Sequence, residues 1–90
     1  MYYVYILLCD QKTFYVGMTD NLERRLLQHQ RKESPYTKKF SEAVVVYKEN
    51  FTNFVSAENR ELQLKKWSIA KKKALISGNI NLLRRLSRGS

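Results

Sequence analysis

The pattern of apolar and polar residues divides the chain into short strands followed by helices. YYVYILLC at residues 2–9 and TFYVGM at residues 13–18 are rich in aromatic and β-branched residues and are too short for typical helices. We therefore predict two strands. The polar tripeptide DQK at residues 10–12 has the length of a hairpin connection.

The register of this hairpin decides which side chains share a face of the sheet. A connection centred near Asp10 places Tyr5 opposite Tyr15 and Tyr3 opposite Gly17, all on one face. A β-bulge would shift that register. On this prediction Gly17, which has no side chain, gives room for Tyr3.

Helical spacing begins after the hairpin. Asp20 followed by Glu23 forms a capping-box-like start for a helix that runs to about Gln30. At about 100° per residue, one arc of this helix holds Leu22, Arg25, Leu26 and His29. The arginine and the histidine therefore share the leucine side of the helix.

The second half of the chain changes from strand to helix again. Residues 31–42 are polar, contain the only proline and are predicted to form a loop, and residues 43–50 form a third strand. Helical spacing returns from Ser56, a candidate N-cap, to about Ser68, and one or two short helices broken near residues 78–79 follow. This order predicts a small mixed α/β layer of the α+β kind, in which three strands, antiparallel at the hairpin, pack against helices.

Composition narrows the class of protein. Ninety residues with 43% hydrophobic content can bury one modest core, so we expect a single domain over residues 1–90. The single cysteine, Cys9, cannot form an intramolecular disulfide, and the sequence has neither a signal-peptide pattern nor an apolar run of about 20 residues. We expect a cytoplasmic protein without a membrane partner, and take a monomer as the working assumption.

Charge is distributed unevenly along the chain. The net charge is +9, yet residues 1–64 hold nine basic and eight acidic side chains. The segment 65–90 has no acidic residue, and its basic residues are Lys65, Lys66, Lys71, Lys72, Lys73, Arg84, Arg85 and Arg88. Such a segment suits a polyanion, either nucleic acid or an anionic membrane surface, and the alternative is a solvated helical face.

One acidic residue lies inside an apolar pattern. Ala57, Leu64 and Trp67 form an apolar stripe on the helix predicted from Ser56, and Glu61 falls within it. A carboxylate in such a stripe is costly unless it is paired, protonated or bound to a metal. The alternatives for Glu61 are a half-exposed position at the edge of the stripe or an ion pair with Arg25.

Arg25 and His29 are open to a similar alternative, in which their stems cover the core and their polar ends reach water. Together with Glu61 and two tyrosines, however, they would form a convergent polar site. One cysteine and one histidine cannot supply the usual zinc ligands. Gly17 alone makes no phosphate-binding loop, and a Ser-His-Asp arrangement has no support beyond its residue types.

Four sequence motifs carry a resemblance to a known family. YVY at residues 3–5, YVG at 15–17, LERRLLQH at 22–29 and AENRELQLKKW at 57–67 resemble the GIY-YIG nuclease domain. The chain looks most like the small stand-alone GIY-YIG proteins of poorly defined cellular role, over a motif core of residues 2–77. The resemblance implies a three-stranded antiparallel sheet flanked by helices, and divalent-metal-dependent hydrolysis of phosphodiester bonds, usually in DNA.

By this resemblance the active site maps onto Tyr5, Tyr15, Arg25, His29 and Glu61. Arg25 suits the phosphoryl oxygens, and Glu61 is an oxygen ligand for Mg²⁺ or Mn²⁺. Either Tyr5 or His29 acts as the general base, and Tyr15 positions the phosphate or the water.

The chain also departs from the family pattern. Tyr3 stands in place of the first glycine, and Val4 and Val16 stand in place of the isoleucines. The late asparagine of the family has Asn79 as a possible counterpart, and Asn81 is a weaker one.

These observations predict a DNA endonuclease of low sequence specificity, with structured or damaged DNA among its candidate substrates and DNA favoured over RNA. Affinity would come mostly from the basic segment 65–90 through phosphate contacts, which carry little sequence information. The alternatives are a non-catalytic nucleic-acid-binding module that retains the site, and an interaction protein whose basic segment docks on an acidic partner or a membrane.

Overall fold

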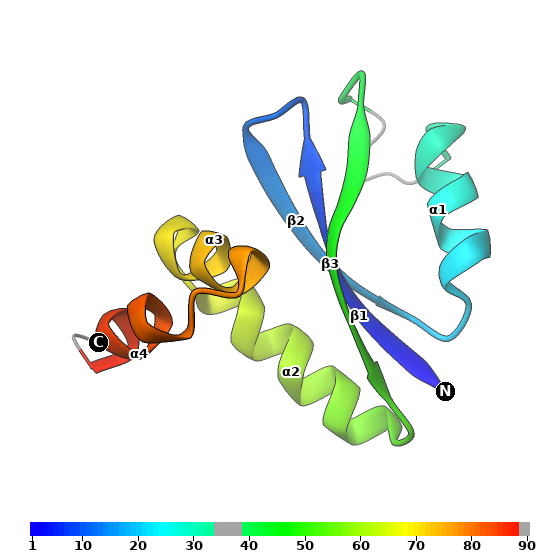
Figure 1. The fold of residues 1–90 in the computed structure, drawn as a ribbon. Coiled ribbons are helices and arrows are strands. Elements are labelled where there is room, and N and C mark those ends of the chain that lie inside the picture. The colour runs from blue at the N-terminus through cyan, green and yellow to red at the C-terminus, as the bar shows by residue number, and fades with distance from the viewer. Residues whose placement is uncertain (34–38, 89–90) are drawn as a thin grey trace.

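The computed structural model describes residues 1–33 and 39–88 of the chain (Figure 1). The predicted loop at 31–42 lies partly outside the described residues, and its proline lies outside them. Within the described residues the elements follow the predicted order of two strands, a helix, a strand and further helices. They are β1 (Tyr2–Cys9), β2 (Thr13–Thr19), α1 (Leu22–Gln30), β3 (Ala43–Phe51), α2 (Phe54–Lys66), α3 (Ile69–Ser77) and α4 (Ile80–Arg88).

The three strands form one antiparallel sheet in the order β2-β1-β3, with β1 in the centre. β2 is therefore an edge strand. Helices α1 and α2 lie on opposite sides of this sheet (Figure 1). The predicted three-stranded antiparallel sheet flanked by helices is confirmed.

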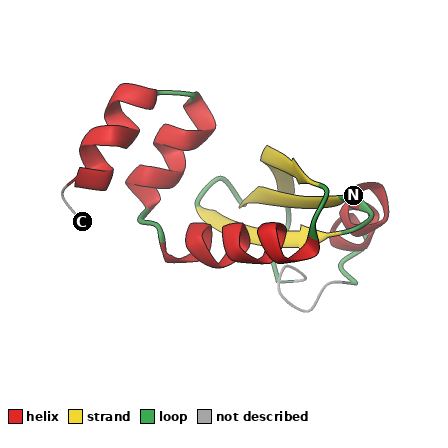
Figure 2. Cartoon of the chain, turned by 90° about the horizontal axis from the view of Figure 1, so that it is seen from below, coloured by secondary structure: helices red, strands yellow, loops and turns green. Residues whose placement is uncertain are grey.

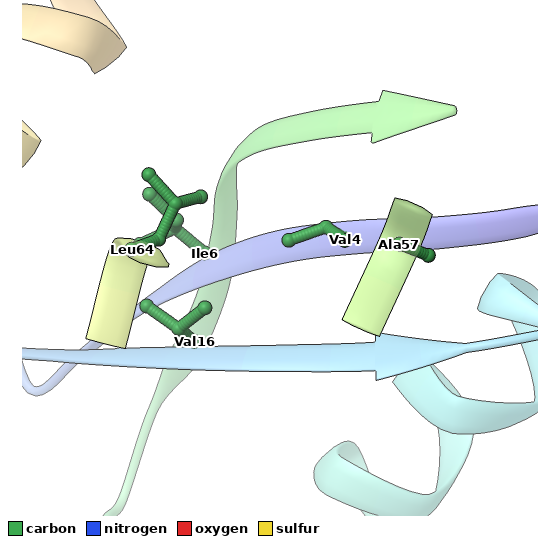
Figure 3. Close-up of a cluster of buried hydrophobic side chains, with 5 residues drawn as sticks. All are labelled: Val4, Ile6, Val16, Ala57 and Leu64. Carbon is green, nitrogen blue, oxygen red and sulfur yellow. The ribbon is translucent and has the colours of Figure 1, made fainter. Parts of the chain in front are cut away.

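One face of the sheet packs against α2. Successive side chains of a strand point to opposite faces, so Val4 and Ile6 of β1 share a face. Both are fully buried with Val16 of β2 and with Ala57 and Leu64 of α2 (Figure 3). This core of small and branched side chains fixes α2 along the sheet.

The other face packs against α1. Tyr5, Leu7 and Cys9 of β1 are buried there, and Leu22 and Leu26 of α1 pack on them. The leucine side of α1 faces the sheet, as its spacing predicts. Arg25 and His29 belong to the same arc of the helix, so they also lie on this side.

The register predicted for the hairpin is wrong by two residues. Tyr5 pairs with Gly17, whereas Tyr3 pairs with Thr19. The cause is the connection, in which Asp10 and Gln11 both adopt a left-handed conformation, with φ of 51° and 60°. The turn is therefore centred on residue 11 rather than on residue 10, and Gly17 faces Tyr5 instead of Tyr3.

Both predicted N-caps are also displaced. The side chain of Asn21, not Asp20, accepts a hydrogen bond from the Arg24 amide and begins α1. The side chain of Asn53 accepts from the Ser56 amide, so α2 begins earlier than predicted. Asparagine and aspartate are about equally good N-caps, so the side chain that reaches the third amide of the helix decides between neighbours.

The C-terminal helices form a pair beyond the end of the sheet (Figure 2). α3 ends at Ser77, and the C-cap Gly78 that follows has a φ of 73°, the left-handed conformation that glycine favours, so the predicted break is confirmed. Leu75 and Ile76 of α3 pack on the core beneath α2, whereas α4 packs on α3 and buries none of its residues fully. In the described ranges, no helix is long and apolar enough to cross a membrane.

Candidate active site

A buried hydrogen bond joins β1 to α1. The hydroxyl oxygen of Tyr5 lies 3.1 Å from Nε2 of His29. The exposed fraction is 1% for Tyr5 and 4% for His29, so this polar contact lies inside the packed layer between α1 and the sheet. Buried polar groups that bond to each other are fixed in position, because breaking the bond would leave both unsatisfied.

The tyrosine ring reaches this position by crossing Gly17. A Cβ atom at residue 17 would stand 2.5 Å from both Cζ and the hydroxyl oxygen of Tyr5, and 3.0 Å from Cε1 of Tyr15. Only glycine leaves space for this approach. Because Gly17 belongs to the edge strand β2, the Tyr5 hydroxyl lies near the edge of the sheet, where helices on either face can reach it.

Tyr15 completes a cluster of three rings. Its ring centroid lies 6.4 Å from that of Tyr5 and 5.6 Å from that of His29. The Tyr5 and His29 rings are 6.0 Å apart with an edge-on geometry. We call Tyr5, Tyr15 and His29 the tyrosine–histidine cluster.

Burial and charge set the protonation of the hydrogen-bonded pair. Burial raises the pKa of the Tyr5 phenol well above its ordinary value, the charges of Tyr15 and Glu61 raise it further, and Arg25 opposes them. Burial lowers the pKa of His29, and the nearby Arg25 lowers it again. A neutral imidazole therefore faces a protonated phenol, an arrangement in which the Tyr5 hydroxyl donates to Nε2.

Two opposite charges act on the Tyr5 hydroxyl from the two sides of the sheet. Arg25 lies one helical turn before His29 on α1 and is half-buried. Glu61 comes from α2, its side chain is 18% exposed, and its carboxylate lies 3.6 Å from Nζ of Lys65. Of the two alternatives for Glu61, the half-exposed position agrees with the structure, and the ion partner of the carboxylate is Lys65 rather than Arg25.

His29 also lies at the wall of a small cavity. A cavity of about 200 Å³ at the C-terminal end of α1 is lined by His29 together with residues that include Phe40 and Ala43. His29 therefore belongs both to the buried cluster and to the wall of this cavity.

Sequence reasoning missed the contacts that hold α2 in place. Nε and Nη2 of Arg60 each donate to one carboxylate oxygen of Glu49 on β3 at 2.9 Å, and Tyr47 also donates to this carboxylate. The Arg60 guanidinium lies 5.1 Å from the ring centre of Trp67. Arg60 immediately precedes Glu61, so this network fixes the turn of α2 that carries Glu61. The sequence signal for this network is the position of Arg60 directly beside Glu61 within AENRELQLKKW.

The predicted nucleic-acid contacts divide into two groups. Near the sheet, Lys65 pairs with Glu61, Nζ of Lys71 lies 4.6 Å from the Trp67 ring centre, and burial lowers the pKa of Lys72. Lys66 and Lys73 are exposed. These five lysines lie at the end of α2 and along α3.

The arginines lie on α4. At about 100° per residue, one side of this helix holds the leucines at residues 82, 83 and 86. The opposite side holds Arg84, Arg85 and Arg88, which are all exposed and which we call the arginine face. The side chain of Asn79 accepts a hydrogen bond from the Leu82 amide and so caps α4.

The donor set suits a hard cation held through one carboxylate. Among the described residues, no group of three or more histidine, cysteine, aspartate or glutamate side chains could hold a metal ion. Mg²⁺ keeps several waters and is commonly bound through one or two carboxylates plus substrate phosphates. Glu61, with its carboxylate near the Tyr5 hydroxyl, fits that mode of binding.

Comparison with known proteins agrees with this fold. The family model of the GIY-YIG catalytic domain matches residues 1–74, and the chain belongs to the GIY-YIG family. This is a family of nuclease type, so the resemblance seen in the sequence is confirmed.

The similar chains are small UPF0213 proteins. A UPF0213 protein of Natronomonas pharaonis is 38% identical over 77 residues, which cover 84% of this chain and 91% of that protein. Another, from Syntrophus aciditrophicus, is 40% identical over 79 residues, which cover 86% and 91%. The solution NMR structure of a UPF0213 protein from Bacillus halodurans superposes with a TM-score of 0.57 at 32% identity, covering 86% of this chain and 84% of that one.

Proposed function

We propose that the protein is a metal-dependent endonuclease that hydrolyses phosphodiester bonds in DNA with low sequence specificity. The observation that carries the proposal is the buried hydrogen bond of 3.1 Å between Tyr5 and His29, with Arg25 and Glu61 both acting on the same hydroxyl. Phosphodiester hydrolysis needs a base, a cation for the phosphoryl oxygens and a carboxylate for a metal ion. The Tyr5–His29 pair, Arg25 and Glu61 are the candidates for these parts.

The Tyr5–His29 pair supplies the general base. A protonated phenol cannot accept a proton until it gives up its own. As a water bonds to phosphorus and the bond from phosphorus to the leaving oxygen breaks, the proton of the water passes to the Tyr5 oxygen and the Tyr5 proton passes to Nε2 of His29. The base is therefore the pair, which reconciles the two candidates that the sequence left open.

The two charged residues bind the substrate phosphate. The Arg25 guanidinium donates to the nonbridging phosphoryl oxygens, whose charge grows during the reaction. Glu61 would hold Mg²⁺ or Mn²⁺, which supplies charge neutralisation at the phosphoryl and leaving oxygens when bound. Tyr15 borders both rings of the pair and positions the phosphate or the water.

The basic segment provides affinity that does not depend on sequence. The lysines of α2 and α3 and the arginine face of α4 carry positive charge for phosphates. The leucine side of α4 packs on α3, so the arginine face is free of that contact. This distribution supports nucleic acid as the partner.

A metal titration tests the proposal. Nicking of supercoiled plasmid should require Mg²⁺ or Mn²⁺, and Glu61→Gln should reduce the rate about 100-fold or more and raise the metal concentration needed. Glu58→Gln removes an exposed carboxylate from the same helix and is the matched control. Metal-independent nicking, or equal losses in both variants, would contradict the proposal.

One observation favours a second function. The Glu61 carboxylate already has Lys65 at 3.6 Å, and a carboxylate neutralised by a lysine can serve structure alone. The protein would then be a non-catalytic nucleic-acid-binding module. Salt-sensitive DNA binding without cleavage at any Mg²⁺ or Mn²⁺ concentration would favour this alternative.

A further inference from the structure

A second cavity lies beside the tyrosine–histidine cluster, between the sheet and the start of α1. Its volume is about 290 Å³, and its lining residues are Tyr3, Asp20, Asn21, Leu22, Glu23 and Lys48. Tyr3 and Tyr5 are two residues apart in β1, so they share a face about 7 Å apart along the strand. Lys48 pairs directly with Tyr5 across the β1–β3 ladder. The cavity therefore begins one strand position away from the Tyr5–His29 pair.

The chemistry of the lining disfavours a phosphate. Asp20 and Glu23 both present exposed carboxylates; Asp20 lies 3.4 Å from the Arg24 guanidinium, yet the two acidic side chains outnumber Lys48 in the lining and disfavour an anion. Carboxylates are instead good acceptors for the exocyclic amino groups of nucleobases. Tyr3 is half-buried, so part of its ring is available at the wall of the cavity, and aromatic rings stack on bases.

We infer that this cavity binds an unpaired nucleobase that carries an exocyclic amino group, in the strand whose phosphodiester lies at Tyr5 and His29. The placement of the phosphodiester at Tyr5 and His29 rests on the proposed function. Tyr3 stacks on the base, Asp20 or Glu23 accepts from its amino group, and Lys48 faces the neighbouring phosphate. We call the cavity the base subsite.

The base subsite defines a class of substrate. A base inside a duplex is stacked and paired, so it cannot enter the cavity without being flipped out. Adenine, cytosine and guanine have exocyclic amino groups, whereas thymine does not. The substrate is therefore DNA that is unpaired beside the cleaved bond, with thymine disfavoured there. Tyr3, which departs from the glycine of the family pattern, supplies the ring on which this binding depends.

Binding without metal tests the subsite independently of cleavage. In EDTA, the fluorescence anisotropy of labelled dC8, dT8 and a short duplex gives three affinities for each variant. Tyr3→Leu should weaken dC8 binding about tenfold and leave duplex binding unchanged, and Tyr3→Phe should retain dC8 binding. Tyr2→Leu is the matched control, because Tyr2 points to the other face and contacts Phe54 with ring centroids 5.5 Å apart.

The carboxylates have a test of their own. The wild type should bind dC8 more tightly than dT8, and the double variant Asp20→Asn, Glu23→Gln should lose that preference. The ratio of the two affinities cancels the general effect of removing negative charge. A preference for dT8, or a ratio unchanged in the double variant, would overturn the role of the carboxylates.

The subsite and the nuclease can fail separately. Tyr3-dependent binding of dC8 by a protein that never cleaves DNA supports the subsite and overturns the proposed function. Metal-dependent cleavage by a protein whose dC8 affinity is the same with Tyr3→Leu and Tyr2→Leu overturns the subsite alone. Circular dichroism on each variant verifies that the fold is retained.

Discussion

Tyr5 lies directly over Gly17, with its hydroxyl in the space that any other residue would fill. A Cβ atom at residue 17 would stand 2.5 Å from Cζ of Tyr5, well inside van der Waals contact. Gly17→Ala must therefore displace the ring and break its bond to His29. We expect a loss of about 1–3 kcal/mol in the free energy of unfolding and loss of nicking activity.

Gly78→Ala is the matched control for this variant. Beyond its own neighbours in the chain, no atom of the described residues lies within 4 Å of a Cβ at residue 78, but its φ of 73° strains any side chain. It should cost about 1 kcal/mol of stability while the folded protein retains full activity. Equal activity in the two variants at a temperature where both are folded would contradict the role of Gly17.

The pH dependence of stability should report on His29. Burial and Arg25 lower its pKa in the folded state, whereas the unfolded state titrates near the ordinary value of about 6.5. Between these two pKa values the unfolded state binds more protons, so stability rises with pH through that window and levels off above it. Urea unfolding at several pH values should show this rise in the wild type and a smaller one in His29→Gln. Identical profiles would show that His29 titrates normally.

The contact between Arg60 and Glu49 should hold α2 and, through it, Glu61. The two side chains are 23% and 19% exposed. Arg60→Ala leaves the carboxylate without its bidentate partner, and we expect a cost of about 1–3 kcal/mol in unfolding free energy together with slower nicking. Breaking the exposed Asp20–Arg24 pair with Arg24→Ala should cost less than about 1 kcal/mol. If Arg60→Ala destabilises the protein but leaves the metal dependence and rate of nicking unchanged, Arg60 does not position Glu61.

The arginine face of α4 should contribute salt-dependent affinity. Each phosphate contact adds about 0.9 to the slope of log K against log salt concentration in duplex DNA. Replacing Arg84, Arg85 and Arg88 by glutamine should therefore lower the slope by up to about 3. Replacing the same three arginines by lysine should keep most of this slope. A slope unchanged by the glutamine variant would show that α4 does not touch DNA.

Much of this arrangement follows from periodicity in the sequence. The spacing of leucines on α1 places Arg25 and His29 on the packed side, and the stripe on α2 places Glu61 near the core. The hairpin register does not follow, because it depends on two non-glycine residues, Asp10 and Gln11, that both take left-handed conformations.

Contacts between distant elements also escape the sequence pattern. The Arg60–Glu49 pair joins β3 to α2, and no local periodicity links the two positions. The cavity at Tyr3 likewise depends on how α1 meets the sheet. One domain over residues 1–90, the cytoplasmic location, the monomeric state and the roles of the site residues remain predictions.

The most direct test of the central claim compares two adjacent arginines of α1. Arg25 acts on the Tyr5–His29 pair, whereas the side chain of Arg24 is 61% exposed and pairs with Asp20. In a plasmid-nicking assay with Mg²⁺ or Mn²⁺, the account predicts that Arg25→Ala lowers the rate about 100-fold or more while Arg24→Ala retains the wild-type rate. Nicking that survives Arg25→Ala at the rate of Arg24→Ala would contradict a phosphodiesterase site built on these residues.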